Sequence, residues 1–122
     1  MHETPFVSVV VPVRNFERTI DKTFKELLNV KYPRENWEII IADGGSIDKT
    51  LDIIRSWQKK YSFIKLVEIP DCPSPAFARN KALEVAKGEF IFFTDGDCAL
   101  RGLDRYYAQG LYERSGDRRC WR

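Results

Sequence analysis

The chain has 122 residues and a formal net charge of +2 at pH 7. Hydrophobic residues make up 43% of it and charged residues 31%, which is typical of a globular domain and argues against intrinsic disorder. No apolar run approaches the roughly 20 residues of a membrane-spanning helix, and the start of the chain lacks the features of a signal peptide. We therefore expect one domain in the cytoplasm or at the inner face of the membrane.

The histidine and cysteine content excludes several kinds of site. His2 is the single histidine, so neither a Ser-His-Asp triad nor a histidine-based metal site is expected. The three cysteines, Cys72, Cys98 and Cys120, are odd in number and far apart. They therefore predict reduced thiols rather than a disulfide framework or a thiolate metal site.

Charge is unevenly distributed along the chain. Residues 1–100 contain 14 basic and 15 acidic side chains, whereas residues 101–122 contain six arginines and three acidic side chains. We interpret this basic C-terminal segment as a solvated polar end, with contact to anionic lipid at a membrane surface as the alternative. The chain lacks the repeated aromatic and basic residues that bind single-stranded nucleic acid, so no nucleic acid partner is expected.

The first half of the chain predicts two strands and two helices. Residues 6–11 are β-branched and apolar, as in a central strand, and Pro12 ends the run because proline has no N–H for the ladder. Asn15 is expected to cap a helix that ends before Pro33. Residues 37–42 predict a second buried strand. A glycine-rich turn follows it, and Ser46 or Asp48 in or after that turn is expected to cap the second helix.

The second half continues the alternation. Residues 63–68 predict a third strand, whose charges favour the edge of a sheet. Ser74 is expected to cap a third helix and Gly88 to end it in a left-handed conformation. A buried strand over residues 90–93 follows. The resulting βαβαβαβ order predicts an α/β domain with a mainly parallel four-stranded sheet flanked by helices.

After this strand the pattern weakens. Residues 103–114 have the spacing of one further helix, whereas residues 115–122 are polar and predict no element.

Three polar turns follow strands one, two and four of this predicted sheet. They comprise residues 12–15, 43–46 and 95–97. Because the carboxyl ends of parallel strands meet at the same edge, we expect these turns to lie in one crevice.

The residue types in these turns predict the chemistry of the ligand. Asp95 and Asp97 are hard oxygen ligands that suit Mg²⁺ or Mn²⁺. Asp43 can accept a hydrogen bond from a base or a ribose, and Arg79 in the third helix could reach phosphates. A metal at the aspartate pair would neutralise a departing diphosphate. The inferred ligand is a nucleoside diphosphate joined to a group that is transferred.

Four motifs in this order resemble family 2 glycosyltransferases of the GT-A fold. They occupy residues 7–15, 38–50, 78–83 and 88–97, and the resemblance covers residues 6–98. It implies a Rossmann-like GT-A half-domain that binds a nucleotide sugar over residues 1–100. Residues 101–122 would form a short basic C-terminal segment.

The resemblance also implies a nucleotide-diphosphate sugar donor, transfer with inversion, and Mn²⁺ or Mg²⁺ as cofactor. The residues that match nucleotide-sugar-binding positions of the family are Pro12, Val13, Arg14, Asp43, Arg79, Asp95, Gly96 and Asp97. In this match Asp43 reads the base, Asp97 binds the metal, and Asp95 lies on the ribose side. The acceptor, which could be a glycan, a lipid or a protein, is not specified.

Two positions depart from the family pattern. Gly44 stands where the family often has a second aspartate, a loss that is tolerable if the first aspartate reads the base. Ile47 stands where threonine is usual, which removes one hydroxyl from the turn.

The end of the chain is a larger departure. In the family a second half follows, with the acceptor site and a carboxylate that acts as general base. Glu113 and Asp117 lie in no recognisable family motif, so no catalytic residue is identified and the base is expected beyond Arg122. Three explanations remain open: a truncated product, a shifted reading frame and a naturally short relative. We expect donor binding with little or no turnover, and a homodimer that hides the face the second half would cover.

Two other functions compete with glycosyl transfer. A non-catalytic nucleotide-binding module would bind the donor and transfer nothing. A phosphatase of the haloacid-dehalogenase type also places Asp-x-Asp at a strand end, with the first aspartate as nucleophile. That motif prefers threonine or valine where this chain has Ala99. We interpret Asp48 as a helix cap rather than a ligand. We interpret Cys98 as a packed thiol rather than a nucleophile.

Overall fold

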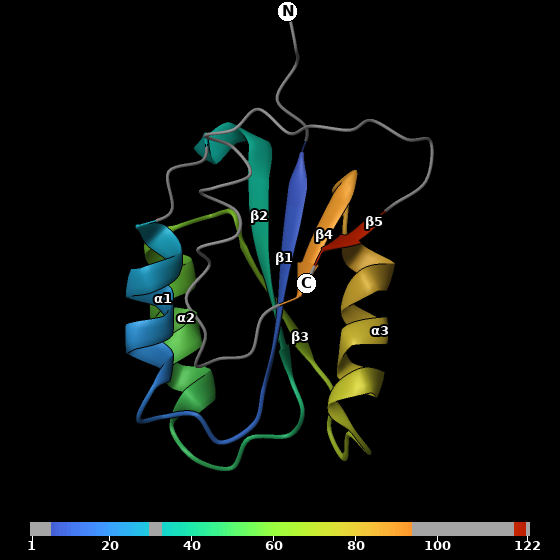
Figure 1. Ribbon diagram of the computed structural model, residues 1–122. Helices are drawn as coiled ribbons and strands as arrows, with labels where there is room; N and C mark the ends of the chain where they lie inside the picture. The colour runs from blue at the N-terminus through green and yellow to red at the C-terminus, as the bar shows by residue number, and fades with distance from the viewer. Residues whose placement is uncertain (1–5, 30–32, 94–118, 122) are drawn as a thin grey trace, which may run out of the picture.

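The computed structural model describes residues 6–29, 33–93 and 119–121. The elements are β1 (Val7–Val13), α1 (Ile20–Leu28), the 3₁₀ helix η1 (Arg34–Asn36), β2 (Trp37–Asp43), α2 (Thr50–Lys60), β3 (Ile64–Glu68), α3 (Pro75–Val85), β4 (Phe90–Phe93) and β5 (Arg119–Trp121). The strands of the described residues pair in parallel in the order β3-β2-β1-β4-β5. Helices α1 and α2 cover one face of the sheet and α3 the other (Figure 1). The expected α/β fold is confirmed.

The two faces of the sheet bury two separate cores. Alternate side chains of a strand point to opposite faces, so Val9 packs with Phe24 and Ile54 on the side of α1 and α2. Val10 instead packs with Ala78 of α3 on the other side. Because β1 and β2 lie inside the sheet and are covered on both faces, their near-continuous apolar runs follow from their position.

The sheet has one more strand than the four predicted. Residues 119–121 form β5, in which Arg119 pairs with Phe90 of β4. A strand of three residues is too short to show an alternating apolar pattern, so its sequence gave no signal. The other edge of the described sheet is β3, as its charges predicted.

The first helix begins later than Asn15, so the predicted cap at that residue is wrong. Asn15 has a positive φ of 57°, which asparagine tolerates better than most residues. The chain then makes a turn in which the amide of Ile20 donates to the carbonyl of Phe16 at 2.8 Å, and α1 starts at Ile20. The side chain of Asn15 is therefore free to bind another loop.

The starts of the other two helices follow their predicted caps more closely. The N-cap of α2 is Lys49, which makes no side-chain cap, whereas Asp48, one residue earlier, accepts a 2.9 Å hydrogen bond from the amide of Thr50, the first residue of α2. Ser74 accepts from the amide of Phe77 at 3.2 Å, with Pro75 at the first helical position of α3. Gly88 does not form the predicted left-handed cap, since α3 ends in extended backbone at Ala86 and Gly88 has no positive φ.

Candidate functional site

The carboxyl ends of β1, β2 and β4 lie at the same edge of the sheet. Val13, the last residue of β1, pairs with Asp43, the last residue of β2. Phe93 ends β4 beside Val10. The strand order changes direction between β1 and β4, and ligands of open parallel sheets bind at such a switch point. The turns after β1 and β2 therefore meet as predicted, whereas Asp95, Gly96 and Asp97 lie outside the described residues.

The turn after β2 is organised around the carboxylate of Asp43, which is 1% exposed. This carboxylate accepts hydrogen bonds of 3.0 Å from the amides of Gly45 and Ser46, and a further one from the hydroxyl of Ser46. Gly45 has a φ of 95°, a conformation that side chains rarely adopt. Asp43 thus holds its own turn together, and its predicted contact with a base stays a prediction.

The loop after β1 is bound directly to this turn. The amide of Asn15 donates to the hydroxyl oxygen of Ser46 at 2.9 Å, and the amide of Ile47 donates to the side-chain oxygen of Asn15 at 2.9 Å. One residue later, the amide of Phe16 donates to the hydroxyl of Thr50 at 2.8 Å. The two loops are therefore locked together by reciprocal hydrogen bonds.

The same two segments are joined by two further hydrogen bonds. The amide of Glu17 donates to Asp48 at 3.2 Å, and the carboxylate of Glu17 accepts from the amide of Lys49 at 3.4 Å. Desolvation would raise the pKa of Asp48, but hydrogen bonds from the hydroxyl and amide of Thr50 and the amide of Glu17 outweigh it and lower that pKa.

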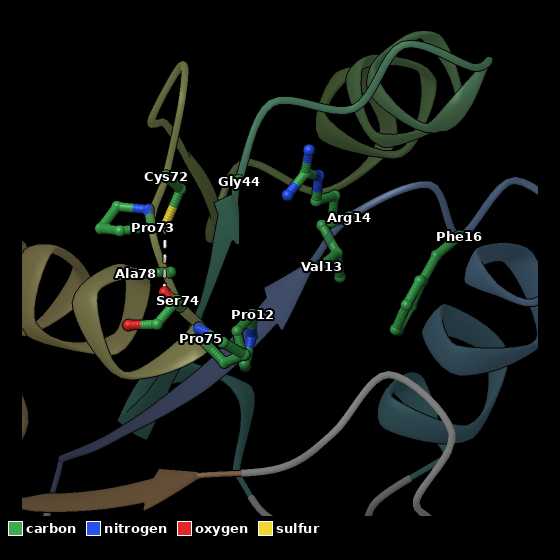
Figure 2. Close-up of a pocket in the computed structure, with 10 residues that line it drawn as sticks. All are labelled: Pro12, Val13, Arg14, Phe16, Gly44, Cys72, Pro73, Ser74, Pro75 and Ala78. Carbon is green, nitrogen blue, oxygen red and sulfur yellow. Dashed lines mark hydrogen bonds between the residues drawn. The ribbon is translucent and has the colours of Figure 1, made fainter.

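A pocket of about 370 Å³ opens beside these loops. It is lined by Pro12, Val13, Arg14, Phe16, Gly44, Cys72, Pro73, Ser74, Pro75 and Ala78 (Figure 2). Its walls come from the end of β1, the turn after β2 and the loop that leads into α3. Most of the lining is apolar, as in sites that hold a flat ring, and the guanidinium of Arg14 adds hydrogen-bond donors.

Several lining residues were missed from the sequence, above all those from Cys72 to Pro75. Because β3 is parallel to its neighbours, the loop after it leaves the same edge of the sheet, and this was the signal that could have located them. Cys72 is buried, and its thiol donates to the carbonyl of Ser74 at 3.1 Å. A Cβ on Gly44 would lie 3.3 Å from the Cβ of Cys72, so these two segments are in close contact.

The predicted site residues are thus brought together only in part. Pro12, Val13 and Arg14 line the pocket. Arg79 lies on α3 and is partly buried. It is not among the lining residues.

Residues 6–29, 33–93 and 119–121 contain no cluster of three or more His, Cys, Asp or Glu side chains that could hold a metal ion. No helix in the same ranges is long and apolar enough to cross a membrane.

Comparison with known proteins places these features in a family. Residues 8–102 match the model of glycosyl transferase family 2. The chain is 39% identical over 92 residues to a poly(ribitol-phosphate) beta-glucosyltransferase of Bacillus spizizenii, an alignment that covers 75% of this chain and 14% of the relative. It is also 35% identical over 111 residues to a probable glycosyltransferase, YdaM, of Bacillus subtilis, which covers 88% of this chain and 26% of the relative.

Solved structures show the same fold. TarS residues 1–349 of S. aureus, in complex with UDP-GlcNAc, superposes with a TM-score of 0.76 and 28% identity, over 87% of this chain and 30% of that one. The mannosyltransferase PcManGT of Pyrobaculum calidifontis, in complex with GDP-Man and Mn²⁺, gives a TM-score of 0.79 and 29% identity, over 89% and 32%. This chain spans less than a third of the length of each of these four relatives. With its GT-A fold and its match over residues 8–102, the chain belongs to glycosyl transferase family 2.

Proposed function

We propose that this chain binds a nucleotide-diphosphate sugar at the carboxyl edge of its sheet and takes part in metal-dependent glycosyl transfer with inversion. The observation that carries the proposal is the pocket at the carboxyl edge of the sheet, which Pro12, Val13 and Arg14 help to line. Relatives of the same fold have been solved with UDP-GlcNAc and with GDP-Man and Mn²⁺, which supports a nucleoside diphosphate as the leaving group.

The pocket accounts for the nucleoside part of such a donor. Its apolar walls can hold the base, and the exposed guanidinium of Arg14 can donate to a base carbonyl or to a phosphate. The base contact predicted for Asp43 remains part of this proposal. Three hydrogen bonds from its own turn already bind the carboxylate and hold that turn in place.

The metal is assigned to Asp95 and Asp97, which follow β4 and supply the hard oxygen ligands that Mn²⁺ and Mg²⁺ prefer. A divalent ion there would stabilise the negative charge of the departing diphosphate. The acceptor would be a glycan, a lipid or a protein. Membership of the family favours sugar transfer over the phosphatase that the Asp-x-Asp pattern alone also allowed.

Calorimetry tests the proposal directly. The 122-residue chain should bind at least one of a set of UDP-, GDP- and dTDP-sugars in the presence of Mn²⁺, and EDTA should weaken that binding. The Asp97→Ala variant should lose the metal-dependent part of the affinity. The matched control is Asp52→Ala, which removes an exposed carboxylate of α2 and should bind as the wild type does. A folded wild-type sample that binds none of these donors would contradict the proposal.

A further inference from the structure

The hydroxyl of Ser46 joins the two loops beside the pocket. It accepts a hydrogen bond from the amide of Asn15 at 2.9 Å and donates one to the carboxylate of Asp43. A hydroxyl can do both at once, because it has one donor and two acceptor sites. The end of β2 is thereby connected, through one side chain, to the loop after β1.

Asn15 closes the connection from the other side. Its side-chain oxygen accepts from the amide of Ile47 at 2.9 Å, and its φ of 57° turns the chain sharply between Arg14 and Phe16. Both of these neighbours line the pocket (Figure 2). Asn15 and Ser46 are not among the lining residues. Asn15 is thus adjacent in the chain to two residues of the pocket, and Ser46 is joined to it by a hydrogen bond.

We infer that Asn15 and Ser46 are positioning residues of the nucleotide pocket, which hold Arg14 and Phe16 in the geometry that binds the donor. This inference rests on the proposed function for the identity of the ligand. A loop that is already ordered loses less conformational freedom when the ligand binds, so a clamp of this kind raises affinity without touching the ligand.

Four variants separate this role from a purely structural one. Ser46→Ala removes the bridging hydroxyl, and Ser46→Thr retains it. Asn15→Gly removes the side chain but still permits the positive φ. The control is Ser56→Ala, which deletes a hydroxyl that donates to the carbonyl of Ile53 within α2, away from the pocket.

The first readout is the affinity of each folded variant for UDP, GDP and dTDP, measured with Mn²⁺ well below its melting temperature. Ser46→Ala and Asn15→Gly should bind about tenfold more weakly than wild type, which corresponds to about 1.4 kcal/mol. Ser46→Thr and Ser56→Ala should stay close to the wild-type value. Hydrogen exchange without ligand is the second readout, and the amides of residues 14–17 should exchange faster in Ser46→Ala.

The outcomes distinguish the two proposals. If Ser46→Ala and Asn15→Gly bind the nucleotide as tightly as wild type does, the positioning role is overturned, even if their amide hydrogens exchange faster. The positioning role is also overturned if Ser56→Ala weakens nucleotide binding as much as Ser46→Ala does. Wild type that binds none of UDP, GDP and dTDP contradicts the proposed function, and the positioning role then fails with it. If Asn15→Gly does not fold, the two Ser46 variants decide the question.

Discussion

The amide of Gly88 donates a 2.8 Å hydrogen bond to the hydroxyl of Ser8, across a contact that leaves no room for a side chain. A Cβ built on Gly88 would lie 2.5 Å from the backbone nitrogen of Ser8 and 2.7 Å from its hydroxyl oxygen. The segment between α3 and β4 is therefore pressed against β1. Glycine is required here for close approach rather than for a positive φ.

Gly88→Ala should accordingly destabilise the fold. Backbone atoms of β1 cannot move aside as a flexible side chain could, so we expect the free energy of unfolding to fall by about 2–3 kcal/mol. Urea denaturation followed by circular dichroism measures it. The control is Lys87→Ala, which truncates the exposed neighbouring side chain and leaves its backbone amide in place. A loss below about 1 kcal/mol for Gly88→Ala would show that the segment relaxes.

Glu38 is bound in the same cluster. It is 3% exposed, and its carboxylate accepts from the hydroxyl of Ser8 at 2.6 Å and from the amide of Lys87 at 2.8 Å, while Lys65 forms an ion pair with it at 2.6 Å. Burial alone would raise the pKa of Glu38, but the hydrogen bonds from Lys65, Lys87 and Ser8 outweigh it, and the pKa is lowered from 4.5.

This lowered pKa predicts the direction of the pH dependence. A carboxyl group with a lower pKa in the folded state stabilises the fold above its unfolded pKa, and the stabilisation is lost as the pH falls through the folded value. The free energy of unfolding should therefore decrease as the pH drops below about 4.5, the ordinary value of the group. Glu38→Gln should be less stable than wild type at pH 7, by about 1–3 kcal/mol, and should show a flatter profile at acidic pH.

Denaturation at a series of pH values from neutral to acidic tests this prediction. Glu68→Gln is the matched control, because Glu68 forms its ion pair with Arg55 at an exposed site, where such pairs contribute little. If the free energy of unfolding falls with pH in the same way for wild type and Glu38→Gln, Glu38 is not the cause of the stability lost at acidic pH.

The central part of the fold could be predicted because the apolar pattern and the local capping residues of its segments indicate the same elements. The apolar runs of β1 and β2 are long, so both strands follow directly from the pattern. The predicted end of the first strand at Pro12 is wrong, because β1 continues to Val13, with Pro12 paired to Ala42. Ser74 and Pro75 likewise mark the start of α3 by local chemistry alone.

The remaining features depend on contacts between distant segments. Asn15 resembles a helix cap locally, but it binds Ile47, which is 32 residues away in the chain. Gly88 resembles a helix end, but its role depends on Ser8, 80 residues away. Cys72 lines the pocket because β3 ends at the same edge as β2, which no local pattern indicates. Tertiary contacts therefore decide these positions rather than local propensity.

The contact between Gly44 and Cys72 predicts that these two positions are energetically coupled. A Cβ on Gly44 would lie 3.3 Å from the Cβ of Cys72, closer than ordinary van der Waals contact, and both residues line the pocket. Gly44→Ala should therefore cost about 1 kcal/mol in the wild-type background. In a Cys72→Gly background, where the opposing Cβ is absent, the same substitution should cost less. A double-mutant cycle by urea denaturation should give a coupling energy of about 0.5–1 kcal/mol.

The family often has an aspartate where this chain has Gly44, and the same contact predicts how this chain would respond to that residue. Gly44→Asp should displace Cys72 and destabilise the fold more than Gly44→Ala does, because a carboxylate would also enter a largely apolar pocket. Cys72→Gly should restore part of the lost stability. Equal effects of Gly44→Asp in both backgrounds would mean that the turn after β2 moves as a unit, away from the loop that carries Cys72.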